Sequence, residues 1–126
     1  MADKRIFISF AIEDENYRDL LKGQSLNTKS NFTYTDMSAK DPWDTKWKTN
    51  CRTRIKGCDG VIALISTKTR NADGAKWEMN CANEEGIPMI GMHIHKDNKG
   101  QIPSELSGKK VIEWNWEEIK KFIDSL

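Results

Sequence analysis

The sequence predicts an α/β fold, a flavodoxin-like three-layer sandwich around a five-stranded parallel sheet in the order 2-1-3-4-5. Segments with strand-like and helix-like apolar periods alternate about every ten to fifteen residues, which is typical of βαβ units. Gly60–Ser66 is an unbroken apolar run, as expected for a central strand covered on both faces. Phe32–Asp36 alternates apolar and polar residues, which favours an edge strand.

The remaining elements follow from the same patterns. In chain order, the expected strands are Arg5–Phe10, Phe32–Asp36, Gly60–Ser66, Pro88–Ile94 and Lys110–Trp114. Three helices between them are marked by apolar residues at helical spacing: Tyr17, Leu20 and Leu21; Trp47, Cys51 and Ile55; Trp77, Cys81 and Ala82.

The chain end carries the clearest helix pattern. Asn115 can cap it, Glu118 occupies the third helical position, and one apolar stripe runs through Trp116, Ile119, Phe122, Ile123 and Leu126. Gly86 is expected to end the third helix. The polar segment Lys96–Gly108 predicts a loop with a short helix around Pro103–Leu106.

Composition argues against several classes of protein, including nucleic-acid-binding and membrane proteins. With 126 residues, we expect one domain over residues 1–126, and the net charge of +1 lacks the basic surplus of nucleic-acid binders. No apolar run approaches the roughly 20 residues of a spanning helix, and the start has no apolar stretch typical of a signal peptide, so we expect no membrane partner. The odd count of 3 cysteines predicts a reducing, cytoplasmic location.

Several common sites are missing from the sequence. It has neither a Gly-x-x-x-x-Gly-Lys-Ser/Thr loop nor a Gly-x-Gly-x-x-Gly motif, and Ser66 stands where a two-component receiver needs an Asp. His93 and His95 lack a third ligand at a usual spacing, so we predict no metal and ordinary hydrogen bonds for both. Glu13 and Asp14 are expected to cap and charge the first helix.

The fold predicts where a ligand would bind. In doubly wound sheets, ligands occupy the crevice at the carboxyl ends of the strands where the winding reverses, here between strands one and three. The candidate binding residues there are Ser9, Phe10 and Ala11 on one side and Ser66, followed by Thr67 and Lys68, on the other.

The segment Gly74–Met79 opens the third helix beside this crevice. The carboxylate of Glu78, next to the ring of Trp77, could stabilise a sugar ring that becomes oxocarbenium-like as it loses a leaving group. The alternative is a first-turn acid that offsets the helix dipole, with Trp77 packed on the sheet.

Two further candidates follow the second strand. Asp36 either binds substrate or caps a turn. Trp43 either stacks on a base or a neighbouring subunit, or packs at the start of the second helix.

Five stretches in this order and spacing resemble one known family: Arg5–Phe10, Tyr34–Ser38, Cys58–Ser66, Lys76–Met79 and Gly86–Ile94. From about Lys4 to Ile94, the chain resembles the TIR-like domains that include the NAD-processing component of Thoeris antiphage defence.

The resemblance implies an NAD glycohydrolase or ADP-ribosyl cyclase. Such an enzyme uses NAD as its substrate without a bound cofactor, and releases nicotinamide and an ADP-ribose-derived, cyclic signal that activates a partner effector. The resemblance also implies self-association through TIR surfaces, with the loop Met37–Trp47 completing a neighbour's pocket. Counting back from Gly86 assigns the family's catalytic Glu to Glu78, whereas a register anchored on Trp77 places Cys81 there. A non-catalytic TIR-like interaction module and a nucleoside deoxyribosyltransferase-like enzyme remain the alternatives.

Overall fold

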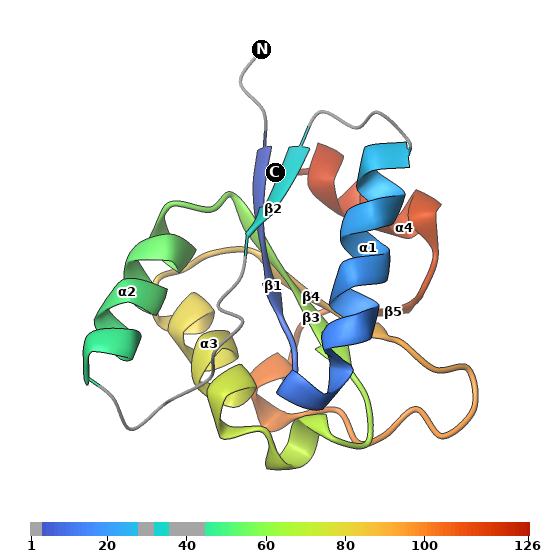
Figure 1. Ribbon diagram of the computed structural model, residues 1–126. Helices are drawn as coiled ribbons and strands as arrows, with labels where there is room; N and C mark the ends of the chain where they lie inside the picture. The colour runs from blue at the N-terminus through green and yellow to red at the C-terminus, as the bar shows by residue number, and fades with distance from the viewer. Residues whose placement is uncertain (1–3, 28–31, 36–44) are drawn as a thin grey trace.

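The computed structural model describes residues 4–27, 32–35 and 45–126, in which five parallel strands form one sheet (Figure 1). The strands are β1 (Lys4–Ser9), β2 (Phe32–Thr35), β3 (Gly60–Ile65), β4 (Met89–His93) and β5 (Val111–Glu113). Their order is β2-β1-β3-β4-β5, and every neighbouring pair is parallel. The predicted fold class and strand order are confirmed, with β3 central and β2 at an edge.

Helices cover both faces of this sheet. They are α1 (Glu15–Asn27), α2 (Thr45–Lys56), α3 (Asp73–Glu84) and α4 (Trp116–Asp124), with 3₁₀ turns η1 (Ile12–Asp14), η2 (Thr69–Asn71) and η3 (Ser104–Leu106). Figure 1 shows α2 and α3 on one face and α1 and α4 on the other. The turn η3 lies in the predicted loop, at the position expected for a short helix.

The sheet divides the core into two clusters because successive strand side chains point to opposite faces. Toward α2 and α3, β1 and β3 contribute Phe7, Val61, Ala63 and Ile65. Toward α1 and α4, the same two strands contribute Ile6, Ile8, Ile62 and Leu64. Every residue of β3 is buried, which agrees with its unbroken apolar sequence.

Helix boundaries agree with local signals in the sequence. The side chain of Asn115 accepts hydrogen bonds from the N–H groups of Glu117 and Glu118, so the predicted cap of α4 is confirmed. Gly86 follows α3 with φ +69°, a left-handed conformation that glycine adopts at little cost. Leu20 differs from the expectation, because it is 61% exposed and Leu21 alone of that pair enters the core.

Two predicted site residues, Asp36 and Trp43, lie outside the described residues. Among the residues that are described, no helix combines the length and apolar character needed to cross a bilayer.

Candidate functional site

The side chain of Glu78 lies completely buried at the carboxyl end of β1. The helix α3 begins at Asp73, so Glu78 stands beyond the first turn, and the expectation of a first-turn acid is wrong. An acid at this depth does not offset the helix dipole, because that effect fades within the first turn. Its position therefore needs another explanation.

Side chains from two other elements contact this carboxylate. Ser9, the last residue of β1, donates a hydrogen bond from Oγ to Oε1 of Glu78 over 3.0 Å. The same hydroxyl lies 3.1 Å from the carbonyl oxygen of Ala75, one turn earlier on α3. The thiol of Cys51 on α2 lies 3.8 Å from Oε2, a weak donor contact. The carboxylate thus lies where β1, α2 and α3 meet.

Burial of this kind is costly. A carboxylate withdrawn from water loses several kcal/mol of hydration, which ordinary hydrogen bonds return only in part. Buried acids are often found at functional sites, although structural ion-pair networks also contain them. Because Glu78 has 0% exposure, a substrate reaches it only when segments packed around it move.

Ser66 lies in a second polar cluster and does not join Glu78. Its Oγ donates to Oδ2 of Asp14 over 2.5 Å and accepts from the N–H of Lys68 at 3.1 Å. The hydroxyl of Thr69 accepts from the N–H of Ser66 at 2.9 Å and so closes the end of β3. Since β3 residues alternate, Ser66 follows Leu64 onto the α1 side of the sheet, opposite the side of Ile65.

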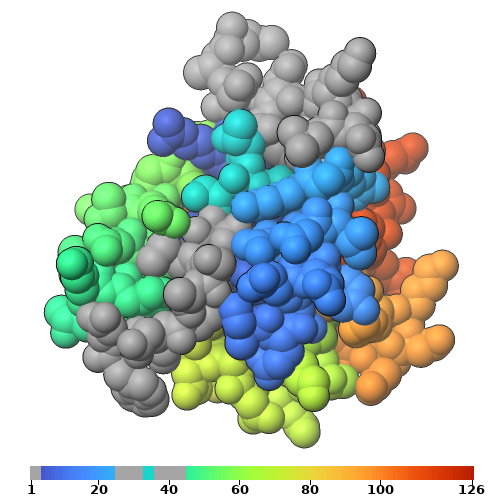
Figure 2. All heavy atoms as spheres, viewed as in Figure 1, coloured from blue at the N-terminus to red at the C-terminus, as the bar shows by residue number. Residues whose placement is uncertain are grey.

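Asp14 is a buried acid whose partner sequence reasoning missed. It is only 4% exposed, and burial raises the pKa of its carboxyl, while the hydrogen bond from Ser66 lowers it. Asp14 lies in the segment that follows the first strand, where a residue of a ligand site is expected. Helix capping explained the same position, so the sequence alone did not distinguish the two roles. Figure 2 shows the start of α1, in blue, directly above the yellow-green segment after β3.

Phe10 follows β1 and belongs to the core cluster on the α1 side, and Ala11 directly precedes η1. Phe10 is fully buried, and the guanidinium of Arg18 lies 5.2 Å from its ring centroid. The carbonyl of Ala11 accepts from the N–H of Asp14 at 2.8 Å. Of the three predicted residues on strand one, the structure brings only Ser9 to Glu78.

Trp77 packs into the contact between α2 and α3. Its ring lies edge-on to Trp47 with centroids 5.3 Å apart, and the guanidinium of Arg52 lies 5.6 Å from the Trp77 ring. Arg52 also pairs with Glu84, over 3.0 Å, and with Glu85. A cation–π contact and two ion pairs therefore hold α2 against α3 beside the candidate site.

The two histidines differ in their surroundings. The ring of His95 meets Tyr17 edge-on with centroids 4.9 Å apart. In the part of the chain that the structure describes, Nδ1 of His93 is buried without a hydrogen-bond partner, contrary to the expected ordinary bonding. Within residues 4–27, 32–35 and 45–126, no three His, Cys, Asp or Glu side chains are grouped to hold a metal ion.

Comparisons with known proteins identify the family of this chain. Residues 7–99 match the family model described as the TIR-like domain of the Thoeris protein ThsB. The chain belongs to this family. The match covers most of this TIR-like domain, from β1 through β4, and includes both Ser9 and Glu78. A comparison with curated proteins finds no match.

Solved structures support the fold. The TIR domain of the Toll-related receptor TRR-2 from Hydra magnipapillata is similar with a TM-score of 0.73 and 13% identity, covering 94% of this chain and 97% of that one. A prokaryotic SEFIR domain is similar with a TM-score of 0.56 and 16% identity, covering 98% of this chain and 89% of that one. At such identities, the likeness establishes the fold alone.

Proposed function

We propose that this TIR-like domain is an enzyme that cleaves NAD, with Glu78 as its catalytic residue. The observation that carries the proposal is the carboxylate of Glu78, fully buried at the carboxyl end of β1 and hydrogen-bonded by Ser9. Ligands of doubly wound sheets bind at this end of the strands. Membership of the ThsB family supports the assignment to antiphage defence.

The chemistry needs one fixed negative charge. The bond between the ribose C1′ and the nicotinamide nitrogen breaks, and its electron pair goes to the cationic pyridinium nitrogen. Nicotinamide leaves as a neutral molecule, so no general acid is required. The ribose becomes oxocarbenium-like, and a nearby carboxylate stabilises that positive charge. Water, or a nucleophilic group of the same ADP-ribose, then attacks C1′ and loses a proton, which gives a linear or a cyclic product.

The neighbours of Glu78 suit this role. The hydroxyl of Ser9 fixes the direction of Oε1 from a strand that is itself buried and rigid. Preorganised groups of this kind stabilise charge without reorganising during the reaction. In a purely protein-binding module, the same carboxylate would be buried at a cost and without a purpose.

In this proposal the cyclic product, formed when a group of the same ADP-ribose attacks C1′, is the signal that activates a separate effector protein. The domain acts in the cytoplasm and self-associates through TIR surfaces. Assay of NAD cleavage in separated monomer and oligomer fractions tests the self-association, and full activity in a strict monomer contradicts it.

Glu78→Gln tests the enzyme directly, because it keeps size and hydrogen bonding but removes the charge. We expect NAD consumption, assayed with the infection trigger and the partner present, to fall about a hundredfold or more. Glu117→Gln, an exposed acid of α4, is the control and should retain full turnover. Full turnover in Glu78→Gln would contradict the role of Glu78. If the wild-type protein consumes no NAD under these conditions, the interaction-module alternative is correct.

A further inference from the structure

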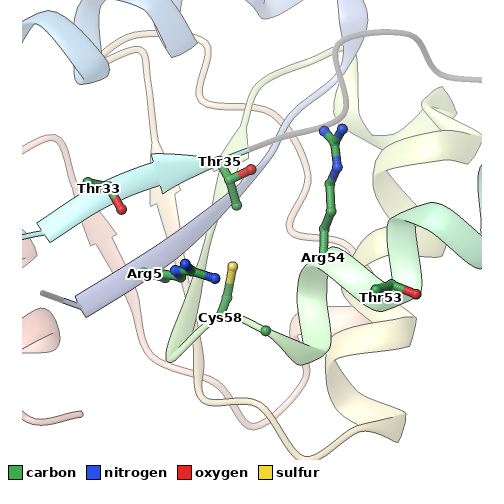
Figure 3. Close-up of a pocket in the computed structure, with 7 residues that line it drawn as sticks. Arg5, Thr33, Thr35, Thr53, Arg54 and Cys58 are labelled. Carbon is green, nitrogen blue, oxygen red and sulfur yellow. The ribbon is translucent and has the colours of Figure 1, made fainter. Parts of the chain in front are cut away.

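A pocket lies on the same sheet face as Glu78, away from the carboxyl end of β1 and beside the end of α2 (Figure 3). Its volume is about 320 Å³, which is at the lower limit for small-molecule sites. It is lined by Arg5, Thr33, Thr35, Thr53, Arg54, Gly57 and Cys58. Among the described residues, the lining therefore combines two guanidinium groups with three hydroxyls and contains no carboxylate.

Two hydrogen bonds with Asp59 fix the backbone of Arg5. Its N–H donates to Oδ2 of Asp59 at 2.8 Å, and the N–H of Asp59 donates to the Arg5 carbonyl at 2.7 Å. In the strand register, Arg5 is paired with Thr33, so both side chains occupy the same face of the sheet. Figure 3 shows the Arg5 side chain extending toward Cys58, with Arg54 rising from α2 on the opposite side.

The electrostatics of the pocket favour an anion. Burial raises the pKa of the Cys58 thiol to about 11, although the Arg5 charge lowers it, so the thiol is neutral at pH 7 and does not repel an anion. Within the described chain, no carboxylate forms an ion pair with the Arg5 guanidinium. Arg54 lines the other wall of the pocket.

Two hydroxyls are available as donors. Thr33 and Thr35 lie two residues apart on β2, so their side chains share the face that lines the pocket. Among the described residues, neither hydroxyl has a hydrogen-bond partner. The third, that of Thr53, already donates to the Thr49 carbonyl at 3.0 Å.

The C-terminal end of α2 opposes an anion only weakly. Helix C-termini carry partial negative charge on unpaired carbonyls. Here, the N–H of Gly57 donates to the Thr53 carbonyl at 3.2 Å, and the N–H of Cys58 donates to the Ile55 carbonyl at 3.0 Å. These bonds pair two of the carbonyls in the last turn of α2.

We propose that this pocket binds the phosphate group of a small phosphate monoester, with Arg5 as a bidentate ligand and Thr33 and Thr35 as hydroxyl donors. The fork of a guanidinium matches two phosphate oxygens, and such charge-assisted bonds are the strong ones. The volume exceeds what a phosphate ion fills and leaves room for a sugar-sized group. The site is separate from Glu78 and does not depend on NAD cleavage.

Binding is tested on the full chain by amide NMR shifts at constant ionic strength. The probes are inorganic phosphate, ribose 5-phosphate and, as the uncharged control, ribose. We expect ribose 5-phosphate to shift the amides of Arg5, Thr33, Thr35 and Cys58, and ribose to leave them unchanged. Arg5→Gln should weaken binding about tenfold, the usual loss for one charge-assisted contact. Arg70→Gln, an exposed cation on η2, is the matched control and should bind normally.

Comparing inorganic phosphate with ribose 5-phosphate distinguishes the source of the phosphate group. Tighter binding of ribose 5-phosphate than of inorganic phosphate identifies an ester, and equal binding identifies the free ion; both outcomes support the pocket. Thr35→Val provides a second variant with an intact Arg5, and we expect it to weaken binding several-fold. Unshifted pocket amides with either phosphate, or equal weakening by Arg70→Gln and Arg5→Gln, would overturn the proposal.

Discussion

The hydroxyl of Ser9 lies 3.0 Å from Oε1 of Glu78, although 69 positions separate the two residues in the chain. The hydrogen bond joins the last residue of β1 to the middle of α3 and places a carboxylate at the carboxyl edge of a parallel sheet. The orientation of the candidate catalytic group therefore depends on how α3 packs against β1.

We expect Ser9→Ala to lower NAD turnover by about tenfold, because the donor that fixes Oε1 of Glu78 is lost. Ser9→Thr keeps the hydroxyl and should recover part of the activity. Steady-state kinetics with NAD distinguish the role, since a positioning residue changes kcat more than KM. Equal turnover in the wild type and Ser9→Ala would show that the hydrogen bond has no part in catalysis. Ser107→Ala, in an exposed loop, is the control.

Glu78→Gln should raise stability while it lowers turnover. The amide can still accept from Ser9, but the charge no longer has to be buried. Active-site residues are selected for function, so neutralising them often stabilises the fold. Urea denaturation of wild type and Glu78→Gln measures the difference. If Glu78 acted as a first-turn acid, Glu78→Gln would instead cause a small loss of stability. Observing that loss would contradict the burial argument.

The fold was predictable because each element has its own periodicity. The all-apolar run Val61–Ile65 and the alternating pattern of β2 placed these strands at the centre and the edge. The site was predictable only in part. The structure places Ser9 of strand one against Glu78, but alternation sends Phe10 to the opposite face. A position near the predicted crevice does not specify which face of the sheet a side chain occupies.

The pairing of Asp14 with Ser66 shows a second limit of the sequence. An acid just before a helix has a sufficient local explanation, namely capping, so nothing in the pattern indicated a contact across 52 positions. In the folded protein, the Asp14 side chain is instead buried and accepts a hydrogen bond from Ser66. Long-range polar pairs of this kind leave no periodic signal.

This pair predicts a pH dependence of stability. Burial raises the folded-state pKa of Asp14 above its usual value of 3.8, so the folded protein binds the proton more tightly than the unfolded chain. The contribution of Asp14 to stability is then fully present below about pH 3.8 and is lost as the pH rises through the folded pKa. We expect Asp14→Asn to reduce the downward slope of unfolding free energy above that pH, measured by urea denaturation at several pH values.

Ser66→Ala supplies the matching variant. The hydrogen bond from Ser66 lowers the pKa of Asp14, so its removal should raise that pKa further and extend the downward slope to higher pH. An NMR titration of the Asp14 carboxyl in both proteins gives the pKa directly. A lower pKa in Ser66→Ala than in the wild type would contradict the assigned role of the hydroxyl.

The contact of α2 with α3 predicts a measurable coupling. Arg52 pairs with Glu84 and Glu85, whose side chains are 55% and 24% exposed, so each pair contributes about 0.2–1 kcal/mol or less after solvent screening. A double-mutant cycle with Arg52→Gln and Glu85→Gln isolates the better-buried pair. We expect a coupling of about 0.5–1 kcal/mol that falls at 1 M salt. A coupling that does not change with salt would contradict an ion pair.

Gly100 makes the closest backbone approach to the segment after β3. A β-carbon at this position would lie 2.4 Å from the carbonyl carbon and oxygen of Ser66 and 2.6 Å from the nitrogen of Thr67, and φ is +85°. Backbone atoms cannot rotate away, so Gly100→Ala must displace one segment from the other. Gly86→Ala is the matched control, because φ there is +69° but nothing lies within 4 Å of the new carbon.

The two variants separate conformational cost from steric cost. Gly86→Ala should lose about 1–2 kcal/mol, the cost of a left-handed conformation for a residue with a β-carbon. Gly100→Ala should lose about 1–3 kcal/mol more, as overpacked sites do. It should also shift the amides of Ser66 and Lys68 in NMR spectra, because their hydrogen bond lies at the displaced segment. If both variants lose the same stability, the close approach of Gly100 to Ser66 does not constrain the protein, and the loops after β3 and β4 are independent of each other.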